Sequence, residues 1–402
     1  MMIYNKRSIS YICMILFSVY NLYSQTSYSP YSMLGLGELE TRDYGRTAGM
    51  GGVGAGMRDY DLLNTTNPSG LTALDSLKFV FDISATAKQS YFASGSKREN
   101  TFNANFRRLA FGFKVSHRWA MAFGTKPFSN VGYQIESDVD IEGSTETKSV
   151  YIEGDGGLYS IYWSNAFLLN KYLSLGINSM YISGNIKQTE NQTDYLFEKS
   201  SRTSQLYNTF GLQFHNGPWV AGLTYGYKQK LTMENSTVIY NSSNTELDSE
   251  DSRSSSQFIP ETFSAGLSWS KKNIVLAMDY EYQKLKGLAS GASSIKITDY
   301  HRIKAGMSYT PDKDIHHYRS QSQYQFGVSL AKSYLQVREN DVYNYTVSAG
   351  YSWPLKGAGL LNMSLEYGNS LSAPKGYIRE SYVGVTVGFS MFETWFKRTK
   401  FR

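Results

Sequence analysis

The feature that most constrains this chain is an alternation of apolar and polar residues, which runs with a period of two from Leu77 almost to the C-terminus. This period places successive side chains on opposite faces of a β-strand. The face opposite the apolar one is rich in Gly and Ser and holds few charges, which is unusual for a sheet face in bulk water but typical of a barrel lumen. The clearest segments are 219–228, 263–270, 274–283, 361–368 and 383–390.

The first 24 residues have the pattern of a cleaved secretory signal peptide. Lys6 and Arg7 form a charged start, residues 9–20 are apolar, and we expect cleavage after Ser24. The apolar stretch is too short to span a bilayer, and no later apolar run reaches ~18 residues. Because only helices and closed barrels span membranes, a membrane form of the mature chain must be a barrel.

Composition and connector lengths favour the same fold. Only 18% of the residues are charged, and the chain contains 35 Gly and 33 Tyr, which suits a wet lumen and aromatic girdles. Short turns alternate with longer polar stretches, as do periplasmic turns and outer loops in bacterial barrels. The longer stretches, expected as outer loops, are 138–148, 189–199, 236–258 and 286–296.

The pattern therefore predicts an all-β fold, a transmembrane antiparallel β-barrel of about 14 strands, an even number as in other bacterial barrels. Residues 25–76 lack the alternation and are expected to form an N-terminal hatch or plug. The barrel is predicted over residues 77–392, and residues 393–402 are predicted to be a basic periplasmic tail. The expected location is the outer membrane of a Gram-negative cell.

Sites for catalysis or cofactors are poorly supported, and we predict no enzyme activity, cofactor, metal or nucleic-acid partner. The only cysteine, Cys13, lies in the leader, and no histidine has metal-ligand spacing. Residues 49–54 fit the pattern G-x-G-x-x-G, but a dinucleotide site needs a preceding strand and a following helix, which are missing here. Asp248, Glu250 and Asp251 are better explained by a solvated outer loop than by a calcium site.

Two motifs in the N-terminal segment resemble a known family. Residues 48–54 read Ala-Gly-Met-Gly-Gly-Val-Gly, and residues 67–71 read Asn-Pro-Ser-Gly-Leu. They are similar to the signature of the FadL-type outer-membrane channels, in which an "A-x-x-M-G-G" segment and an "N-P-A-G-L" segment precede the first strand. The resemblance implies a fourteen-stranded barrel with an internal hatch. The matching hatch residues are Gly49, Gly51, Gly52, Gly54, Asn67 and Pro68.

A third motif lies in the third predicted strand, at residues 126–133. Proline cannot donate a ladder hydrogen bond and glycine weakens a strand interior, so a kink or bulge is expected here. FadL-type barrels have a kink in this strand that opens a lateral hole, whereas the alternative is an ordinary bulge. The residues predicted to form the opening are Pro127, Phe128, Ser129, Asn130 and Gly132.

Two functions remain open. The resemblance implies passive uptake of small hydrophobic molecules, such as long-chain fatty acids, by lateral diffusion through the wall. The alternative is a FadL-like plug subunit of an outer-membrane protein secretion translocon. An apolar lumen pocket would favour uptake, and a filled lumen with an outward protein-binding surface would favour the plug. The partners expected are outer-membrane lipid and hydrophobic molecules, or a secretion-channel protein, and the chain is expected to be a monomer.

Overall fold

The computed structural model describes most of the chain after the predicted signal peptide. The predicted signal, residues 1–24, and the basic tail from residue 395 lie outside the described residues. The structure describes residues 29–40, 44–140, 147–192, 195–286, 295–311, 322–337, 339–355, 359–372 and 377–394.

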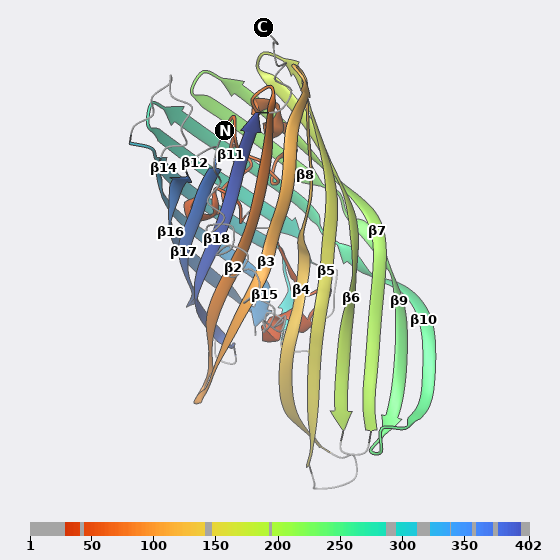
Figure 1. Cartoon of the computed structure of the whole chain (residues 1–402). Coiled ribbons are helices and arrows are strands. Elements are labelled where there is room, and N and C mark those ends of the chain that lie inside the picture. Colours follow the sequence, from red (N-terminus) through yellow and green to blue (C-terminus); the bar gives the residue numbers. More distant parts are fainter. Residues whose placement is uncertain are drawn as a thin grey trace, which may run out of the picture.

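The described strands form an antiparallel ring, which Figure 1 shows as a tall barrel. Three crossings consist of two strand segments each, so the ring has 14 crossings, as the sequence predicts. The strands are β2 (Lys78–Ser94), β3 (Lys97–Ser116), β4 (Trp119–Asp140), β5 (Thr147–Asn170), β6 (Leu173–Gln192), β7 (Tyr195–Asn216), β8 (Trp219–Gly226) with β9 (Gln229–Asn241), β10 (Glu246–Ile259) with β11 (Glu261–Lys271), β12 (Ile274–Lys284), β13 (Ile295–Ile297) with β14 (Tyr300–Tyr309), β15 (Gln323–Val337), β16 (Asn340–Leu355), β17 (Gly359–Ser372) and β18 (Arg379–Thr394).

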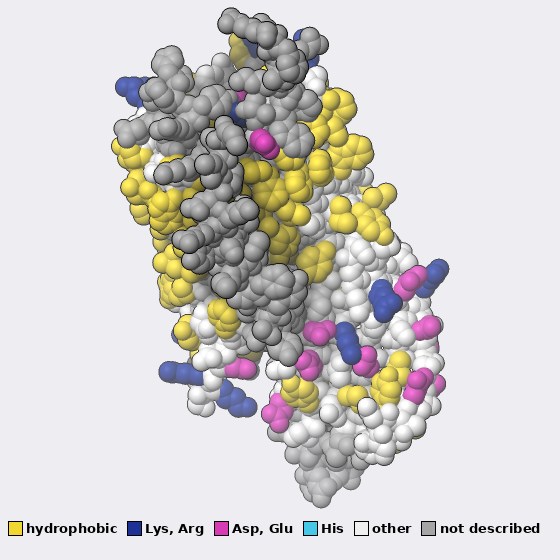
Figure 2. All heavy atoms as spheres, in the orientation of Figure 1, with side chains coloured by type: hydrophobic (Ala, Val, Ile, Leu, Met, Phe, Trp, Pro, Cys, Tyr) yellow, Lys and Arg dark blue, Asp and Glu magenta, His cyan; other side chains and the backbone are white. Residues whose placement is uncertain are grey.

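The alternation in the sequence becomes an outer apolar face and an inner polar face. On β17, Met363 and Leu365 are exposed, whereas Ser364 between them is buried. Figure 2 shows hydrophobic side chains covering the flank of the barrel. Apolar side chains on the outside and small polar ones inside are what a barrel in a bilayer requires. No helix in the described part of the chain is long and apolar enough to cross a membrane.

The ring closes completely only over part of its height. β18 pairs with β2 along its whole length, but β3 and β4 pair only up to Leu109 and Thr125. On the other side, β12 ends at Lys284, opposite Glu261 of β11. Beyond these points the ladders among described residues form two separate sheets. One consists of the outer parts of β4, β5, β6, β7, β9 and β10, and we call it the outer sheet.

The outer sheet corrects the loop predictions. Most of residues 189–199 and 236–258 is strand. β6 extends to Gln192 and β7 begins at Tyr195, while β9 and β10 cover residues 229–241 and 246–259. Figure 1 shows these strands reaching well beyond β11, β12 and β14–β18. Residues 246–253 are exposed on both faces of β10. Because both faces are in contact with water, the sequence shows no alternation there and resembles a loop.

Arginine in the middle of β17 should destabilise the barrel more than arginine at its outer end. Leu365 and Leu371 are 55% and 64% exposed, but Leu365 lies in mid-strand, opposite Ala349 and Val385, whereas Leu371 lies one residue from the end. Arginine costs ~2–4 kcal/mol at the bilayer midplane and ~0–1 kcal/mol near the interface. Guanidinium unfolding in phospholipid vesicles measures both variants, Leu365→Arg and Leu371→Arg. Equal losses of unfolding free energy would contradict this placement of the apolar band.

Candidate functional site

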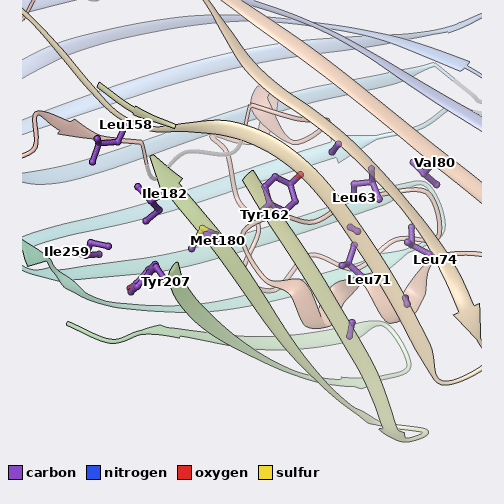
Figure 3. Close-up of a cluster of buried hydrophobic side chains, with 14 of the residues drawn as sticks. Leu63, Leu71, Leu74, Val80, Leu158, Tyr162, Met180, Ile182, Tyr207 and Ile259 are labelled. Atoms are coloured by element: carbon purple, nitrogen blue, oxygen red, sulfur yellow. The ribbon is translucent and has the colours of Figure 1, made fainter. Parts of the chain in front are cut away.

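The N-terminal segment adds no strand to the ring and lies against its inner face in two parts. We call residues 29–40 the strap and residues 44–76 the hatch. The strap contains η2 (Pro30–Met33) and β1 (Glu38–Leu39), and the hatch contains η3 (Ala48–Met50) and η4 (Pro68–Ala73). Figure 3 shows Leu63, Leu71 and Leu74 of the hatch in the same buried cluster as inward-facing side chains of the wall, among them Tyr162 and Met180.

A belt of wall glycines lets the hatch backbone lie directly on the inner face of the strands. At each of these positions a Cβ atom would lie 3.0 Å or less from an atom of a hatch residue. At Gly222 it would overlap the carbonyl oxygen of Ala55, and at Gly327 the backbone of Met50 and Gly51. The belt has one glycine on each of eight strands: Gly112, Gly176, Gly211, Gly222, Gly266, Gly306, Gly327 and Gly350. The absent side chains are therefore what creates room for the hatch.

Polar side chains of the wall bind the hatch backbone from several sides. The Asp279 carboxylate on β12 accepts hydrogen bonds from the N–H groups of Gly54 and Ala55, at 2.6 and 3.0 Å. On β7, Gln213 donates to the carbonyl oxygen of Ala55 at 3.2 Å and to that of Met57 at 3.0 Å. Leaving such buried backbone groups without partners would cost about 1–3 kcal/mol each, so these contacts hold the hatch in place.

Strands β14 and β16 make further contacts to the hatch glycines. On β16, the Ser348 hydroxyl accepts from the N–H of Gly51 and donates to the carbonyl oxygen of Gly49, both at 3.0 Å. Lys304 on β14 donates to the carbonyl oxygen of Gly52 at 3.1 Å. Gly51 and Gly52 have φ angles of +73° and +69°, a conformation that favours glycine. The loop at 49–54 is thus shaped to fit this wall.

Asn67 fixes the second half of the hatch. Its side chain is fully buried, caps η4 by accepting from the N–H of Ser69, and donates to the carbonyl oxygen of Ala55 at 2.8 Å. It also donates to the carbonyl oxygens of Leu212 and Leu223 in the wall, at 3.2 and 3.3 Å. Pro68 follows at the first position of the short helix, where its missing N–H costs nothing.

Two buried cations of the wall in this region form ion pairs. Arg108 on β3 is 2% exposed, forms an ion pair with Asp82 at 3.0 Å and donates to the carbonyl oxygen of Leu63 in the hatch. Lys304 lies 3.6 Å from Glu281. Removing one partner of such a pair would leave an uncompensated charge in the interior, so the pairs fix the hatch in one arrangement.

The motif at Pro127 coincides with the place where β3 and β4 separate. Pro127 is opposite Tyr159 and Ser129 is opposite Leu158, so Phe128 is an extra residue in β4. The β3–β4 ladder ends two residues earlier, at Thr125. We call the gap beyond this point, between residues 97–108 of β3 and the outer part of β4, the seam.

The strap lies along the β4 side of the seam. Glu38 and Leu39 pair with Asn130 and Ser129, and the N–H of Glu40 donates to the carbonyl oxygen of Phe128 at 2.9 Å. The carbonyl oxygen of Gly132 accepts from the N–H of Ser29 at 2.7 Å. The strap thus occupies backbone groups of β4 that β3 leaves unpaired.

Glu40 connects the two sides of the seam. Its carboxylate accepts from Arg107 of β3 at 2.8 Å and from the Asn130 side chain of β4 at 3.1 Å. Nearby in the strap, burial raises the pKa of Glu38, and the Glu380 carboxylate raises it further, while Lys88 opposes both effects. The strap therefore closes the seam by hydrogen bonds and charge pairs, and Leu36 and Leu39 add apolar contacts to the buried cluster against which Phe128 also packs.

A cavity of about 300 Å³ adjoins the strap inside the barrel. Its walls combine tyrosines with charged groups: Lys88 and Glu380 pair at 2.7 Å, and Arg107 and Glu40 also line it. Tyr31 of the strap stacks on Tyr377 with ring centroids 4.8 Å apart. Apolar residues such as Leu36, Phe258 and Leu335 complete a mixed lining, which holds more charge than the mostly apolar pocket expected for a hydrophobic ligand.

The sequence-predicted residues fall into two groups. The hatch set, Gly49 to Pro68, contacts the walls of β7, β8, β12, β14, β15 and β16. The set from Pro127 to Gly132 lies beside the strap. The residues bound to that stretch of β4 are in 29–40, whereas Gly51 and Gly52 lie against β14, β15 and β16. Sequence reasoning missed the strap and the glycine belt. In the described residues, no cluster of three or more His, Cys, Asp or Glu is arranged to hold a metal.

A comparison with family models decides the family. The model of the BamG family matches residues 2–402. The chain belongs to the BamG family. No curated relative matches this BamG-family chain. Solved structures that resemble it confirm the FadL-type fold of an outer-membrane β-barrel.

Three of these structures show how far the likeness extends. The toluene transporter TodX of Pseudomonas putida has a TM-score of 0.62 and 13% identity, covering 90% of this chain and 100% of that chain. The CymD monoaromatic hydrocarbon channel has a TM-score of 0.60 and 13% identity, covering 89% and 97%. A FadL homologue of Pseudomonas aeruginosa has a TM-score of 0.57 and 11% identity, covering 90% and 100%. By their names the first two are transport proteins and not enzymes, and identities this low establish the fold alone.

Gly222→Ala should displace the hatch, because the added methyl group would overlap the carbonyl oxygen of Ala55. Gly384→Ala is the matched control, since a methyl group there would find its nearest atom, the Ala87 carbonyl oxygen, at 3.9 Å. Hydrogen exchange of residues 50–57 in the purified protein should be faster only in Gly222→Ala. Equal exchange in the two variants and the wild type would contradict the role of the belt.

Proposed function

We propose that this BamG-family barrel is a non-enzymatic, plugged subunit of an outer-membrane protein assembly complex. The observation that carries the proposal is the hatch, which is bonded to the wall through buried groups on opposite sides of the lumen. Asp279, Gln213 and Ser348 come from three different strands and all bind hatch backbone groups. Opening a path through the lumen would break all of these bonds at once.

The family supports the same proposal. The name BamG points to an association with the complex that inserts β-barrels into the outer membrane. The outer sheet offers a partner a surface that a simple channel would not need. The cavity beside the strap has ion pairs among its apolar lining residues, and these charges suit a structural part better than a store for hydrophobic molecules. The plug alternative inferred from the sequence is therefore the closer of the two hypotheses, with an assembly complex in place of a secretion translocon.

Membership of an assembly complex can be tested in cells. A tagged copy of the full chain, extracted in mild detergent, should copurify with barrel-assembly proteins in near-equal amounts. A tagged outer-membrane barrel of similar abundance serves as the control. Depletion of the chain should also lower the folded amounts of many unrelated outer-membrane barrels. Recovery of the chain alone, with normal levels of other barrels after depletion, would contradict the proposal.

A second candidate is the lateral uptake of small hydrophobic molecules. The seam beside Pro127 favours it, as do the transport proteins with the same fold. In this candidate the strap would have to leave β4, because it occupies the backbone groups of Ser129 and Asn130 at the seam. The molecule would then pass between β3 and β4 into the bilayer, and the hatch would remain in place.

A disulfide between strap and wall tests this second candidate. Leu39 and Ser129 are directly opposite in the β1–β4 pair, a geometry that accommodates a disulfide, and the only natural cysteine is Cys13 in the predicted leader. In Leu39→Cys/Ser129→Cys, oxidation should stop toluene uptake into vesicles and reduction should restore it. The single variants provide controls for each cysteine. Uptake that is the same in both redox states would rule out passage under the strap.

A further inference from the structure

One edge of the outer sheet, along β10, is open. β10 pairs on one side with β9, from Glu246 opposite Tyr240 to Ile259 opposite Gln229. On the other side, β12 pairs with β11, which continues the same crossing, but β12 ends at Lys284, opposite Glu261 at the start of β11. It therefore does not extend alongside β10. Among the described residues, the ladder partners of β10 all lie on the first side, in β9, and the strap strand β1 pairs with β4 instead. A sheet edge of this kind presents N–H and C=O groups that can pair with another chain.

The edge projects into water rather than into lipid. All residues from Glu246 to Arg253 are exposed, on both faces of the strand. Charged side chains on both faces would be costly in a bilayer. Figure 2 shows charged side chains gathered at the lower right of the molecule, where Figure 1 places the outer ends of the strands leading to β10. A partner reaching this edge would therefore approach from the aqueous side.

The charges of β10 select the partner. The exposed stretch has four acidic residues, Glu246, Asp248, Glu250 and Asp251, and one basic residue, Arg253, which is paired with Glu234 at 2.9 Å. Like charges opposite one another in neighbouring strands are destabilising, whereas opposite charges are favourable. A second copy of this chain, adding its own β10, would place acids against acids. A basic strand would instead meet complementary charges along its length.

We propose that β10 binds an extended, basic segment of a partner protein by β-strand addition. Main-chain hydrogen bonds would supply the affinity, and the acidic side chains would set the specificity, as in other cases of strand addition. A polar groove on the same sheet, with a volume of about 680 Å³, adjoins the edge and is lined by Glu198, Glu234 and Asp251 among others. Long basic side chains of the added strand would extend over it. The proposed assembly role suggests that this partner is another subunit of the assembly complex. The inference rests on the proposed function only for the identity of the partner.

Peptide binding to the purified full-length protein tests the surface directly. The probe is a fluorescent ten-residue peptide in which Lys alternates with Val and Thr. Two control peptides keep the length: one has two central prolines and the same charge, and one has Glu in place of Lys. Fluorescence anisotropy should show binding of the first peptide only, and binding should weaken at high salt. Hydrogen exchange at residues 246–254 should slow when the peptide is bound.

Two variants distinguish peptide binding at the β10 edge from attraction of the peptide to the overall negative charge of the outer sheet. Glu246→Gln/Asp248→Asn/Glu250→Gln/Asp251→Asn should bind the basic peptide about tenfold more weakly, because each exposed charge pair contributes a modest amount. The matched control removes four acids from strands β4, β5 and β6 of the same sheet, which lie away from the groove: Glu136→Gln/Glu153→Gln/Asp155→Asn/Glu190→Gln. Its affinity should stay within about twofold of the wild type.

Three results would overturn the inference: equal binding of the proline peptide, equal affinity of the two quadruple variants, or no slowing of exchange in β10. Self-association of the wild type through β10, detected as a dimer that the first quadruple variant changes, would replace the basic partner with a second copy. These measurements use the purified chain, whereas membership of an assembly complex is measured in cells. Failure of one therefore does not imply failure of the other.

Discussion

The structure depends on the direct contact between the backbone of the hatch and the backbone of the wall. A barrel of this width must fill its lumen or leave it open to water. Here the glycine belt removes the side chains that would otherwise occupy the space, so that main chain meets main chain. Polar side chains beside the belt, among them Asp279, Gln213 and Ser348, then satisfy the backbone groups that this close packing removes from water.

Among the described residues, the outer part of the barrel is not closed by strand pairing on either side of the outer sheet. β3 separates from β4 at Thr125, and the strap takes its place along Ser129 and Asn130. On the other side, β10 extends past the end of β12 with one open edge. The fold that the similar solved transport channels also have is combined here with a hatch bonded to the wall and a projecting sheet, and the proposed assembly role rests on this combination.

The sequence predicted the membrane-spanning part well, because lipid on one side and the lumen on the other impose a strict alternation. The fourteen crossings are confirmed. The outer sheet could not be predicted in this way, since both faces of residues 246–253 are in water and alternation has no cause there. The hatch glycines were found through motifs. The glycines of the wall, such as Gly222 and Gly327, were interpreted only as small lumen residues. Their signal, one glycine on the polar face of each of several strands, becomes meaningful only when a segment is known to lie against them.

The strap gave no sequence signal beyond its position before the hatch. Its two-residue strand, Glu38–Leu39, is too short for a periodic pattern, and its placement depends on a gap in the ladder some 90 residues later in the chain. Contacts of this kind arise from the three-dimensional arrangement alone. The motif around Pro127 indicated where the regular ladder would be interrupted, but not which segment would fill the interruption.

The central claim, that the hatch seals the lumen, is tested most directly by electrical recording. The purified full-length protein is inserted into a planar lipid bilayer, and insertion is verified by resistance to extraction and by heat-dependent migration in gels. The account predicts no conductance steps above the leak of the bilayer, because the hatch is bonded to Gln213 of β7 and to Ser348 of β16, which lie on opposite sides of the wall. Stable, large conductance steps in the wild-type protein would contradict it and show that the lumen is an open pore.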